Sequence, residues 1–128
     1  MMSIPESHLD LLTRPVIAHL AQLRPDGTLQ SNPVWFAWDG ARLRLTTTSD
    51  RQKGRNAAAD PRVALSIHDP DNPYRYLEVR GEVEAIEADP NGKFFDVLAK
   101  RYDLAYDSLP DAARRVVLVI APRAASWQ

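Results

Sequence analysis

A hydroxyl-rich segment followed by regularly spaced cations is the part of this sequence whose residue types could do chemistry. Its members are four consecutive hydroxyl residues and three cations at alternate positions: Thr46, Thr47, Thr48, Ser49, Arg51, Lys53 and Arg55. Hydroxyl groups, the exposed amides at a helix start and cationic side chains all donate hydrogen bonds to anionic oxygens. The segment therefore predicts a site for a phosphate monoester.

A short helix is predicted directly after these hydroxyl residues. Ser49 and Gln52 have the spacing of a capping box, which predicts a helix start at Ser49 with its amides aimed outward. Gly54 inside this helix costs roughly 1 kcal/mol relative to alanine, and close approach by another backbone or by a ligand would explain it. Asp60–Pro61 ends the helix. The competing interpretation is an ordinary surface helix whose basic side chains are solvated.

Side chains suited to hydrolysis or to metal binding are not grouped in this sequence. His8, His19 and His68 are isolated, none lies in a His-x-x-x-His spacing, and no Gly-x-Ser-x-Gly sequence is present. The glutamates between residues 78 and 84 alternate as solvated carboxylates on a strand do. We therefore expect no catalytic side chain and no bound metal, and we expect a phosphorylated cofactor to carry the chemistry.

The composition is that of an ordinary globular chain. Its 128 residues suffice for one core, so residues 1–128 are predicted to form a single domain. Apolar residues make up 45% and charged residues 26%, which argues against long disorder. The net charge of −1 gives no general attraction to a polyanion, so we expect no nucleic-acid partner. The absence of cysteine excludes disulfides and thiolate nucleophiles.

The N-terminal segment Met1–Asp10 has neither the basic region nor the apolar stretch of a secretory signal. No apolar run in the sequence approaches the roughly 20 residues that a membrane-spanning helix needs. We therefore expect a cytoplasmic protein without a membrane partner.

Alternating apolar residues and turn signals predict a mainly β fold. Six strands are predicted, at Val16–Leu23, Leu29–Trp38, Arg42–Thr47, Val63–His68, Tyr74–Ile86 and Val116–Ile120. The first three are expected to form a meander, and Gly81 is expected at a bulge that requires positive φ. Further helices are predicted at Pro5–Leu12 and from Asp89–Pro90 onward. Hairpin-linked strands in a chain of this length favour a closed β-barrel with peripheral helices.

The run from Pro33 to Trp38 places bulky apolar side chains on both faces of one predicted strand. One face can fill the barrel, and the other then needs a partner. A second copy of the chain is the simplest partner, so we predict a homodimer. The apolar run Val116–Ile120 is instead predicted to be buried on both faces.

Three motifs together resemble a known family. They are Ser-Asn-Pro-Val-Trp-Phe at Ser31–Phe36, Arg-x-Lys-x-Arg-Asn at Arg51–Asn56 followed by Asp60–Val63, and Asn-Pro-Tyr-Arg-Tyr at Asn72–Tyr76 followed by Val79–Gly81. Over nearly the whole chain, their order and spacing resemble the pyridoxamine 5′-phosphate oxidase-like split β-barrel proteins. The closer resemblance is to the flavin/deazaflavin oxidoreductase branch that uses coenzyme F420. It implies a six-stranded antiparallel split β-barrel of the FMN-binding type, in a homodimer.

The resemblance also implies which residues hold a cofactor. The family's phosphate-binding motif falls on Thr47, Thr48, Ser49, Arg51, Lys53, Arg55 and Asn56. The segment beside the cofactor ring falls on Asn32, Pro33, Val34 and Trp35, with Gln30 nearby. Contacts to the substrate, or to the cofactor of the second subunit, are implied for Tyr74, Arg75 and Tyr76. Two cofactor sites at the dimer interface are expected.

Coenzyme F420 and FMN are alternatives for the cofactor, because both carry a ring system and a phosphate. The deazaflavin also has a carboxylate-rich tail, and the cations Arg51, Lys53 and Arg55 exceed what one phosphate needs. We therefore expect an F420-dependent oxidoreductase that transfers a hydride between reduced deazaflavin and an unsaturated or conjugated small molecule. The alternatives are an FMN-dependent oxidoreductase of the same fold and a non-catalytic dimer that binds a flavin, haem or another small ligand.

Overall fold

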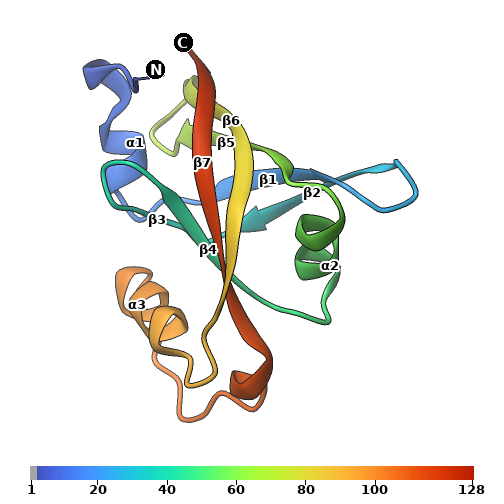
Figure 1. Cartoon of the computed structure of the whole chain (residues 1–128). Coiled ribbons are helices and arrows are strands. Elements are labelled where there is room, and N and C mark those ends of the chain that lie inside the picture. Colours follow the sequence, from blue (N-terminus) through green and yellow to red (C-terminus); the bar gives the residue numbers. More distant parts are fainter. Residues whose placement is uncertain (1–2) are drawn as a thin grey trace.

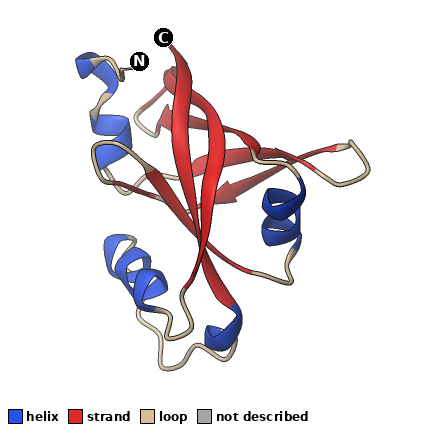
Figure 2. Ribbon diagram, in the orientation of Figure 1, coloured by secondary structure: helices blue, strands red, loops and turns tan. Residues whose placement is uncertain are grey.

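The computed structural model describes residues 3–128 as one curled antiparallel sheet with helices at its periphery (Figure 1, Figure 2). In chain order, the elements are η1 (Glu6–His8), α1 (Asp10–Thr13), β1 (Ala18–Leu23), β2 (Leu29–Val34), β3 (Ala37–Trp38), β4 (Leu43–Thr48), α2 (Gln52–Ala59), β5 (Arg62–Asp69), β6 (Asn72–Ala88), α3 (Lys93–Arg101), η2 (Ala112–Arg114) and β7 (Arg115–Trp127). The strand order is β2-β1-β5-β6-β7-β4-β3. The predicted mainly β split barrel is confirmed.

The second predicted strand is in fact two strands, and the break between them closes the barrel. β2 ends at Val34 and pairs with β1, whereas β3 begins at Ala37 and pairs with β4. These strands lie at opposite ends of the strand order, yet only Trp35 and Phe36 connect them. The two ends of the sheet must therefore lie close together. Both hairpin pairings of the predicted meander are present, but its middle strand is split in two, so the sheet has seven strands instead of six.

The bulky side chains at this break are accommodated within the chain. Phe36 is completely buried in the barrel core, and Trp38 packs against the same core from β3. Trp35 stacks on Tyr102 at the end of α3. The argument that one face of this run needs a second subunit therefore fails, and a homodimer needs a different basis.

β6 and β7 are the longest strands of the sheet, at 17 and 13 residues. Leu118 and Ile120 of β7 belong to the barrel core, while Val117 and Val119 are buried outside that cluster. Because alternate residues of a strand point to opposite faces, β7 is covered on both sides. This confirms the prediction made from its continuous apolar run.

Gly81 lies where β6 and β7 come very close together. The register of the two strands shifts between Arg80 and Gly81, which confirms the predicted bulge. A Cβ atom at Gly81 would overlap the carbonyl oxygen of Ala121. Among the described glycines, positive φ occurs at Gly27, Gly40 and Gly92. Glycine is thus required at position 81 by the approach of β7, and not by the positive φ that we expected.

The start of α2 differs from the sequence prediction. The helix begins at Gln52 without a side-chain cap, whereas the capping box predicted a start at Ser49. The Ser49 amide donates to the carbonyl oxygen of Arg114 at 3.0 Å, so Ser49 extends the pairing of β4 with β7 instead of capping the helix. A Cβ atom at Gly54 would overlap the carbonyl oxygen of Thr48. The capping-box prediction is wrong, but close backbone approach does explain Gly54.

The N-terminal and third helical segments cover parts of the barrel. η1 and α1 occupy the segment predicted at Pro5–Leu12, and Leu11 and Leu12 are fully buried in the core. α3 begins later than Asp89–Pro90 suggested, but the Asp89 carboxylate accepts hydrogen bonds from the amides of Phe94 and Phe95 at 3.1 and 3.3 Å. No helix in residues 3–128 is long and apolar enough to cross a membrane.

Candidate functional site

The break after β2 and the first turn of α2 form two walls of one pocket of about 360 Å³. Its lining residues are Ile17, Pro33, Val34, Trp35, Thr46 and Lys53. Four of these come from the two segments that the sequence predicted to bind a cofactor. The fold therefore brings the predicted ring-side segment to the predicted phosphate-side segment. Ile17, from the linker before β1, carried no sequence signal of its own.

The aromatic wall of this pocket is held rigidly. The Trp35 ring stacks on Tyr102 with centroids 5.1 Å apart and an interplanar angle of 8°, and Phe95 lies 6.4 Å away. The Tyr102 hydroxyl donates to the carbonyl oxygen of Val16 at 2.7 Å and accepts from the amide of Phe36 at 3.2 Å. Trp35 is therefore held in place by its stacking on Tyr102 and by Phe95, and as a fixed aromatic side chain in the lining it suits a bound ring system.

Arg101 fixes the same region from the end of α3. Its guanidinium donates to four main-chain carbonyl oxygens at 2.7 to 3.2 Å, those of Leu12, Thr13, Arg14 and Phe36. These bonds tie the linker before β1 to the break between β2 and β3. Neither Arg101 nor Tyr102 could be assigned this role from sequence, because their partners are backbone atoms more than 60 residues away.

Lys53 is the cation that lines the pocket. Burial lowers the pKa of Lys53 below its usual value of 10.5, and the charges of Arg51 and Arg115 lower it further. Within residues 3–128, no carboxylate forms an ion pair with Lys53. A bound anion would stabilise the charged form of a partly buried cation that has cationic neighbours. This is the electrostatic setting that the phosphate hypothesis requires.

A buried ion pair that sequence reasoning missed lies behind Lys53. Arg115 of β7 makes two hydrogen bonds to Asp111, at 3.0 and 3.1 Å, and its guanidinium lies 4.8 Å from the centroid of the Phe95 ring. Arg115 also reaches the Thr46 hydroxyl at 3.4 Å, and Arg51 contacts Asp111 at 2.8 Å. The spacing of Asp111 and Arg115 is the one available sequence signal. It is shared by many ordinary helical ion pairs.

Thr47 and Thr48 have buried hydroxyls at the end of β4, next to α2. Both residues are 1% exposed and do not line the pocket. The Thr48 hydroxyl interacts with the Asp50 carboxylate and lowers its pKa, whereas the Thr47 hydroxyl has no hydrogen-bond partner within the described chain. Buried hydroxyls without partners are costly, so they mark positions where another acceptor or donor is expected. Thr47 shares the core face of β4 with Leu45, opposite to the pocket residue Thr46, so the fit to an anionic ligand rests on Lys53 and Arg51. Ser49 is exposed at the same turn.

Gln30 and Asn56 join α2 to the sheet through a network of side-chain amides. Asn56 is completely buried and donates to Gln22 and Gln30 at 3.4 and 3.3 Å. Gln30 donates to Asn32 at 2.6 Å, and Gln22 donates to the carbonyl oxygen of Lys53 at 3.1 Å. These residues therefore hold the first turn of α2 against β1 and β2. In this structure they support the pocket without lining it.

The remaining predicted site residues lie elsewhere. Arg55 is exposed and folds back to donate to the Asp50 carbonyl oxygen and to the Gln52 side chain, at 2.8 and 2.6 Å. The segment Tyr74–Tyr76 lies near the two chain termini, away from α2 (Figure 1). Arg75 pairs there with Asp10 and Asp69. Within one chain the fold does not bring these residues to the pocket.

The histidines also have ordinary surroundings. His8 is buried and its imidazole contacts the Ser7 hydroxyl and the Gln128 carbonyl oxygen at 2.8 and 2.9 Å. His19 and His68 stack on neighbouring strands with centroids 6.3 Å apart. In residues 3–128, no three side chains of the metal-ligating types gather closely enough to hold a metal ion.

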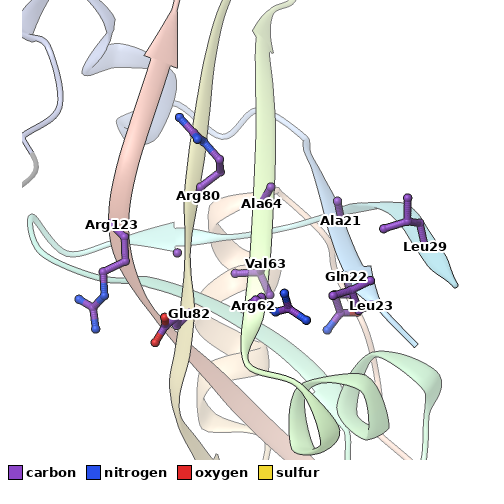
Figure 3. A pocket seen from close by; sticks show the side chains of 11 residues that line it. Ala21, Gln22, Leu23, Leu29, Arg62, Val63, Ala64, Arg80, Glu82 and Arg123 are labelled. Atoms are coloured by element: carbon purple, nitrogen blue, oxygen red, sulfur yellow. The ribbon is translucent and has the colours of Figure 1, made fainter. Parts of the chain in front are cut away.

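A second hollow, of about 380 Å³, lies over β1, β5, β6 and β7. Figure 3 shows small and apolar side chains at its floor, including Ala21 and Ala64, with Arg62, Arg80, Arg123 and Glu82 around them. Arg62 pairs with Asp60 at 2.7 Å and Arg80 with Glu78 at 3.2 Å. Arg62 and Arg80 thus already have carboxylate partners, and this hollow contains none of the predicted cofactor residues.

A curled sheet closed at one short break, with an aromatic-walled and cationic pocket beside that break, defines a split β-barrel that can bind a phosphorylated ring compound. A sequence model of the family Pyridoxamine 5′-phosphate oxidase matches residues 4–127. The chain belongs to this family. No curated protein matches it.

Solved structures agree with this membership. A protein named F420 Reductase is 55% identical, with 96% of this chain and 98% of that one covered and a TM-score of 0.93. The conserved hypothetical protein Rv2991 from Mycobacterium tuberculosis is 26% identical, with 99% and 86% covered and a TM-score of 0.73. General Stress Protein 26 from Bacillus anthracis, at 20% identity, 95% and 91% coverage and a TM-score of 0.73, shares the fold. Family membership and the first of these likenesses support an oxidoreductase.

Proposed function

We propose that this protein is an oxidoreductase that binds coenzyme F420 in the pocket between Trp35 and Lys53. The observation that carries the proposal is that one pocket joins the Pro33–Trp35 segment to Lys53, a partly buried cation with no carboxylate partner in residues 3–128 and with Arg51 beside it. The likeness to the protein named F420 Reductase supports the choice of cofactor. The acceptor is an unsaturated or conjugated small molecule, which takes a hydride from the reduced cofactor or returns one to it.

The residues of this chain bind and orient the cofactor. Lys53 and Arg51 hold the phosphate by charge-assisted hydrogen bonds. Trp35 and Pro33 provide an apolar wall for the ring system. When bound, the deazaflavin supplies the hydride at a ring carbon. Lys53 is the one titratable side chain that lines the pocket, so the protein contributes mainly position and electrostatic stabilisation.

The direct test is a pair of binding titrations, followed by one activity assay. Coenzyme F420 and FMN are titrated separately into the purified protein, and binding is followed by tryptophan fluorescence. Reduced F420 is then mixed with the protein and a panel of conjugated acceptors, and cofactor absorbance is followed. Tight F420 binding with acceptor-dependent oxidation is the expected result. Failure to bind F420 would refute the proposal.

Two alternatives use the same pocket. An FMN-dependent oxidoreductase needs the same ring wall and phosphate site, and selective binding of FMN would identify it. A non-catalytic carrier or sensor of a flavin, haem or another small ligand needs no acceptor. Tight cofactor binding without oxidation by any member of the panel would favour that module. F420 remains preferred, because the protein named F420 Reductase is 55% identical over nearly the whole chain.

A homodimer is part of the proposal, on a different basis from the sequence argument. The hollow of Figure 3 has an apolar floor and a rim with both signs of charge, Arg62, Arg80 and Arg123 beside Glu82. In a two-fold dimer, the same patch faces itself, so arginines of one copy can meet the glutamate of the other. Tyr74, Arg75 and Tyr76 remain candidates for contacts supplied by the second copy.

Sedimentation of the purified protein measures this assembly. The expected mass is about twice the chain mass of 14.4 kDa. Ala64→Glu places an unpaired charge on the apolar floor, so it should give a folded monomer. A wild-type monomer at micromolar concentration would exclude the shared assembly.

A further inference from the structure

The ion pair between Arg115 and Asp111 connects a residue of the pocket lining with an exposed arginine beside α2. Both residues are buried, and the pair lies between the pocket residue Thr46 and the exposed cation Arg51. Asp111 belongs to the turn before β7, and Arg51 precedes α2. Sixty residues of sequence separate these two partners. Asp111 therefore determines where the Arg51 guanidinium lies.

The carboxylate of Asp111 is shared unequally between two arginines. Arg115 engages both oxygens, with Nε at 3.0 Å from Oδ1 and Nη2 at 3.1 Å from Oδ2. Arg51 contacts Oδ2 alone, through Nη2 at 2.8 Å. An arginine has several further N–H donors in a fixed plane. Arg51 thus keeps N–H donors that can bind an anion. The guanidinium of Arg115 is instead engaged by Asp111, Thr46 and the ring of Phe95.

The charges of this cluster explain why the second arginine matters. Arg51 and Asp111 alone would form a neutral pair, and the pocket would lose one of its cations. Arg115 balances the charge of Asp111, so the cluster of these three residues keeps one net positive charge. The pKa of Lys53 is lowered by both Arg51 and Arg115, after the larger effect of burial, which indicates that their charges reach the pocket.

We infer that Arg115 is a positioning residue for the phosphate site: it neutralises Asp111 so that the charge and the remaining donors of Arg51 are available to an anionic ligand. The inference rests on the proposed function, because it concerns the same pocket. Arg115 itself does not line the pocket and is no ligand contact. Its effect passes through Asp111 and Arg51.

The test compares ligands with and without the phosphate: FMN and riboflavin differ by the phosphate alone, and F420 and its ribityl form differ by the phosphate and its tail. Affinities of FMN and riboflavin, and of F420 and its phosphate-free ribityl form, are measured for the wild type and for Arg115→Met, Asp111→Asn and the double variant. Methionine keeps an apolar stem against Phe95 while it removes the charge. The ratio of the FMN and riboflavin affinities isolates the contribution of the phosphate, whereas the ratio for the F420 pair also includes the carboxylate-rich tail; neither needs enzymatic activity.

Arg115→Met should reduce the FMN-to-riboflavin ratio by roughly ten-fold or more, the loss expected when a charge-assisted hydrogen bond is withdrawn. The double variant Asp111→Asn/Arg115→Met should restore the ratio towards the wild type, because no carboxylate is left to neutralise Arg51. A purely structural role for Arg115 predicts no such rescue. Absence of rescue in a folded double variant would overturn the inference.

The single variant Asp111→Asn provides an independent test of the inference if Arg115→Met fails to fold. Its ratio should equal or exceed that of the wild type, since one negative charge near the phosphate is removed. A lower ratio would overturn the inference. If the wild type itself binds FMN no better than riboflavin and F420 no better than its phosphate-free form, the proposed phosphate site fails first, and that result is distinguishable from a failure of Arg115 alone.

Discussion

Two hollows of nearly equal size, about 360 and about 380 Å³, differ in the burial and the ion pairing of the cationic side chains that line them. At the first, Lys53 is partly buried without a carboxylate partner in the described chain, beside the stacked ring of Trp35. At the second, Arg62 and Arg80 already pair with carboxylates around an apolar floor. The comparison shows that volume alone does not identify a cofactor site. The pocket proposed to bind the cofactor differs in that its cation is partly buried beside an aromatic ring, whereas Arg123 of the second hollow is exposed.

Each hollow also lies beside a glycine at which two backbone segments come very close together. Gly54 lets α2 approach the end of β4, next to Lys53, and Gly81 lets β7 approach β6 at the floor of the second hollow. In both cases a Cβ atom would overlap a carbonyl oxygen. The first approach positions cations, whereas the second shapes a surface. Substitutions on the two sides should therefore separate binding from stability.

Gly81→Val should have the largest effect, and it should act on stability. The added side chain overlaps the Ala121 carbonyl oxygen, so we expect a loss of about 2 to 4 kcal/mol in the free energy of unfolding. Denaturant unfolding measures it. The folded fraction should still bind cofactor with wild-type affinity, because the pocket beside Lys53 is on another part of the sheet. Wild-type stability of this variant would contradict the close approach.

Lys53→Ala should act on binding instead. We expect cofactor affinity to fall by roughly 1.5 to 3 kcal/mol, the scale of a hydrogen bond to a charged group. Arg62→Ala in the second hollow is the matched control, since it also removes one cation but should leave affinity unchanged. Titration of both variants at two salt concentrations gives the comparison, because a charge-driven contact weakens with salt. Equal affinities in the two variants would remove the distinction between the hollows.

The pH dependence of binding should reveal the lowered pKa of Lys53. Lys53 holds an anion only while it is protonated, and burial with the charges of Arg51 and Arg115 moves its pKa below 10.5. Affinity should therefore fall as pH rises through this lowered pKa, before an ordinary lysine would titrate. In Lys53→Arg the side chain stays charged, so affinity should stay nearly constant up to about pH 10. Parallel curves for the two proteins would contradict this assignment.

Arg55→Ala should have the smallest effect. Its guanidinium is engaged by the Asp50 carbonyl oxygen just before α2 and by Gln52 in α2, so we expect affinity to change by less than about two-fold, as for other exposed substitutions. The same titration used for Lys53→Ala measures it. A loss as large as that of Lys53→Ala would mean that Arg55 leaves these partners when the cofactor binds.

The sequence predicted the local features because their causes are local. The cations after the hydroxyl run, the apolar run of β7 and the need for glycine at positions 54 and 81 all follow from residue types and spacing. The bulge at Gly81 was predicted for the wrong reason, since positive φ and close backbone approach both require glycine. A sequence shows the requirement but not which of the two produces it.

The errors arose where distant contacts compete with local preference. Ser49 has the right spacing for a cap, but its amide is taken by Arg114 across the sheet. The run from Pro33 to Trp38 looks like one strand, but Phe36 is drawn into the core and Trp35 onto Tyr102, so the strand breaks. In each case burial or pairing with a remote residue outweighed a small local preference.

The sequence by itself determined the chemistry that this protein can offer: hydroxyls and cations for an anion, an aromatic segment for a ring, and no cysteine. Tertiary structure alone decided which of these groups meet. It brought Pro33–Trp35 to Lys53, turned Arg55 back onto its helix, and set Arg115 and Asp111 behind Arg51. The physical reason is that residue type fixes what a side chain can donate, whereas closure of the sheet at the β2–β3 break fixes which distant partners it can reach.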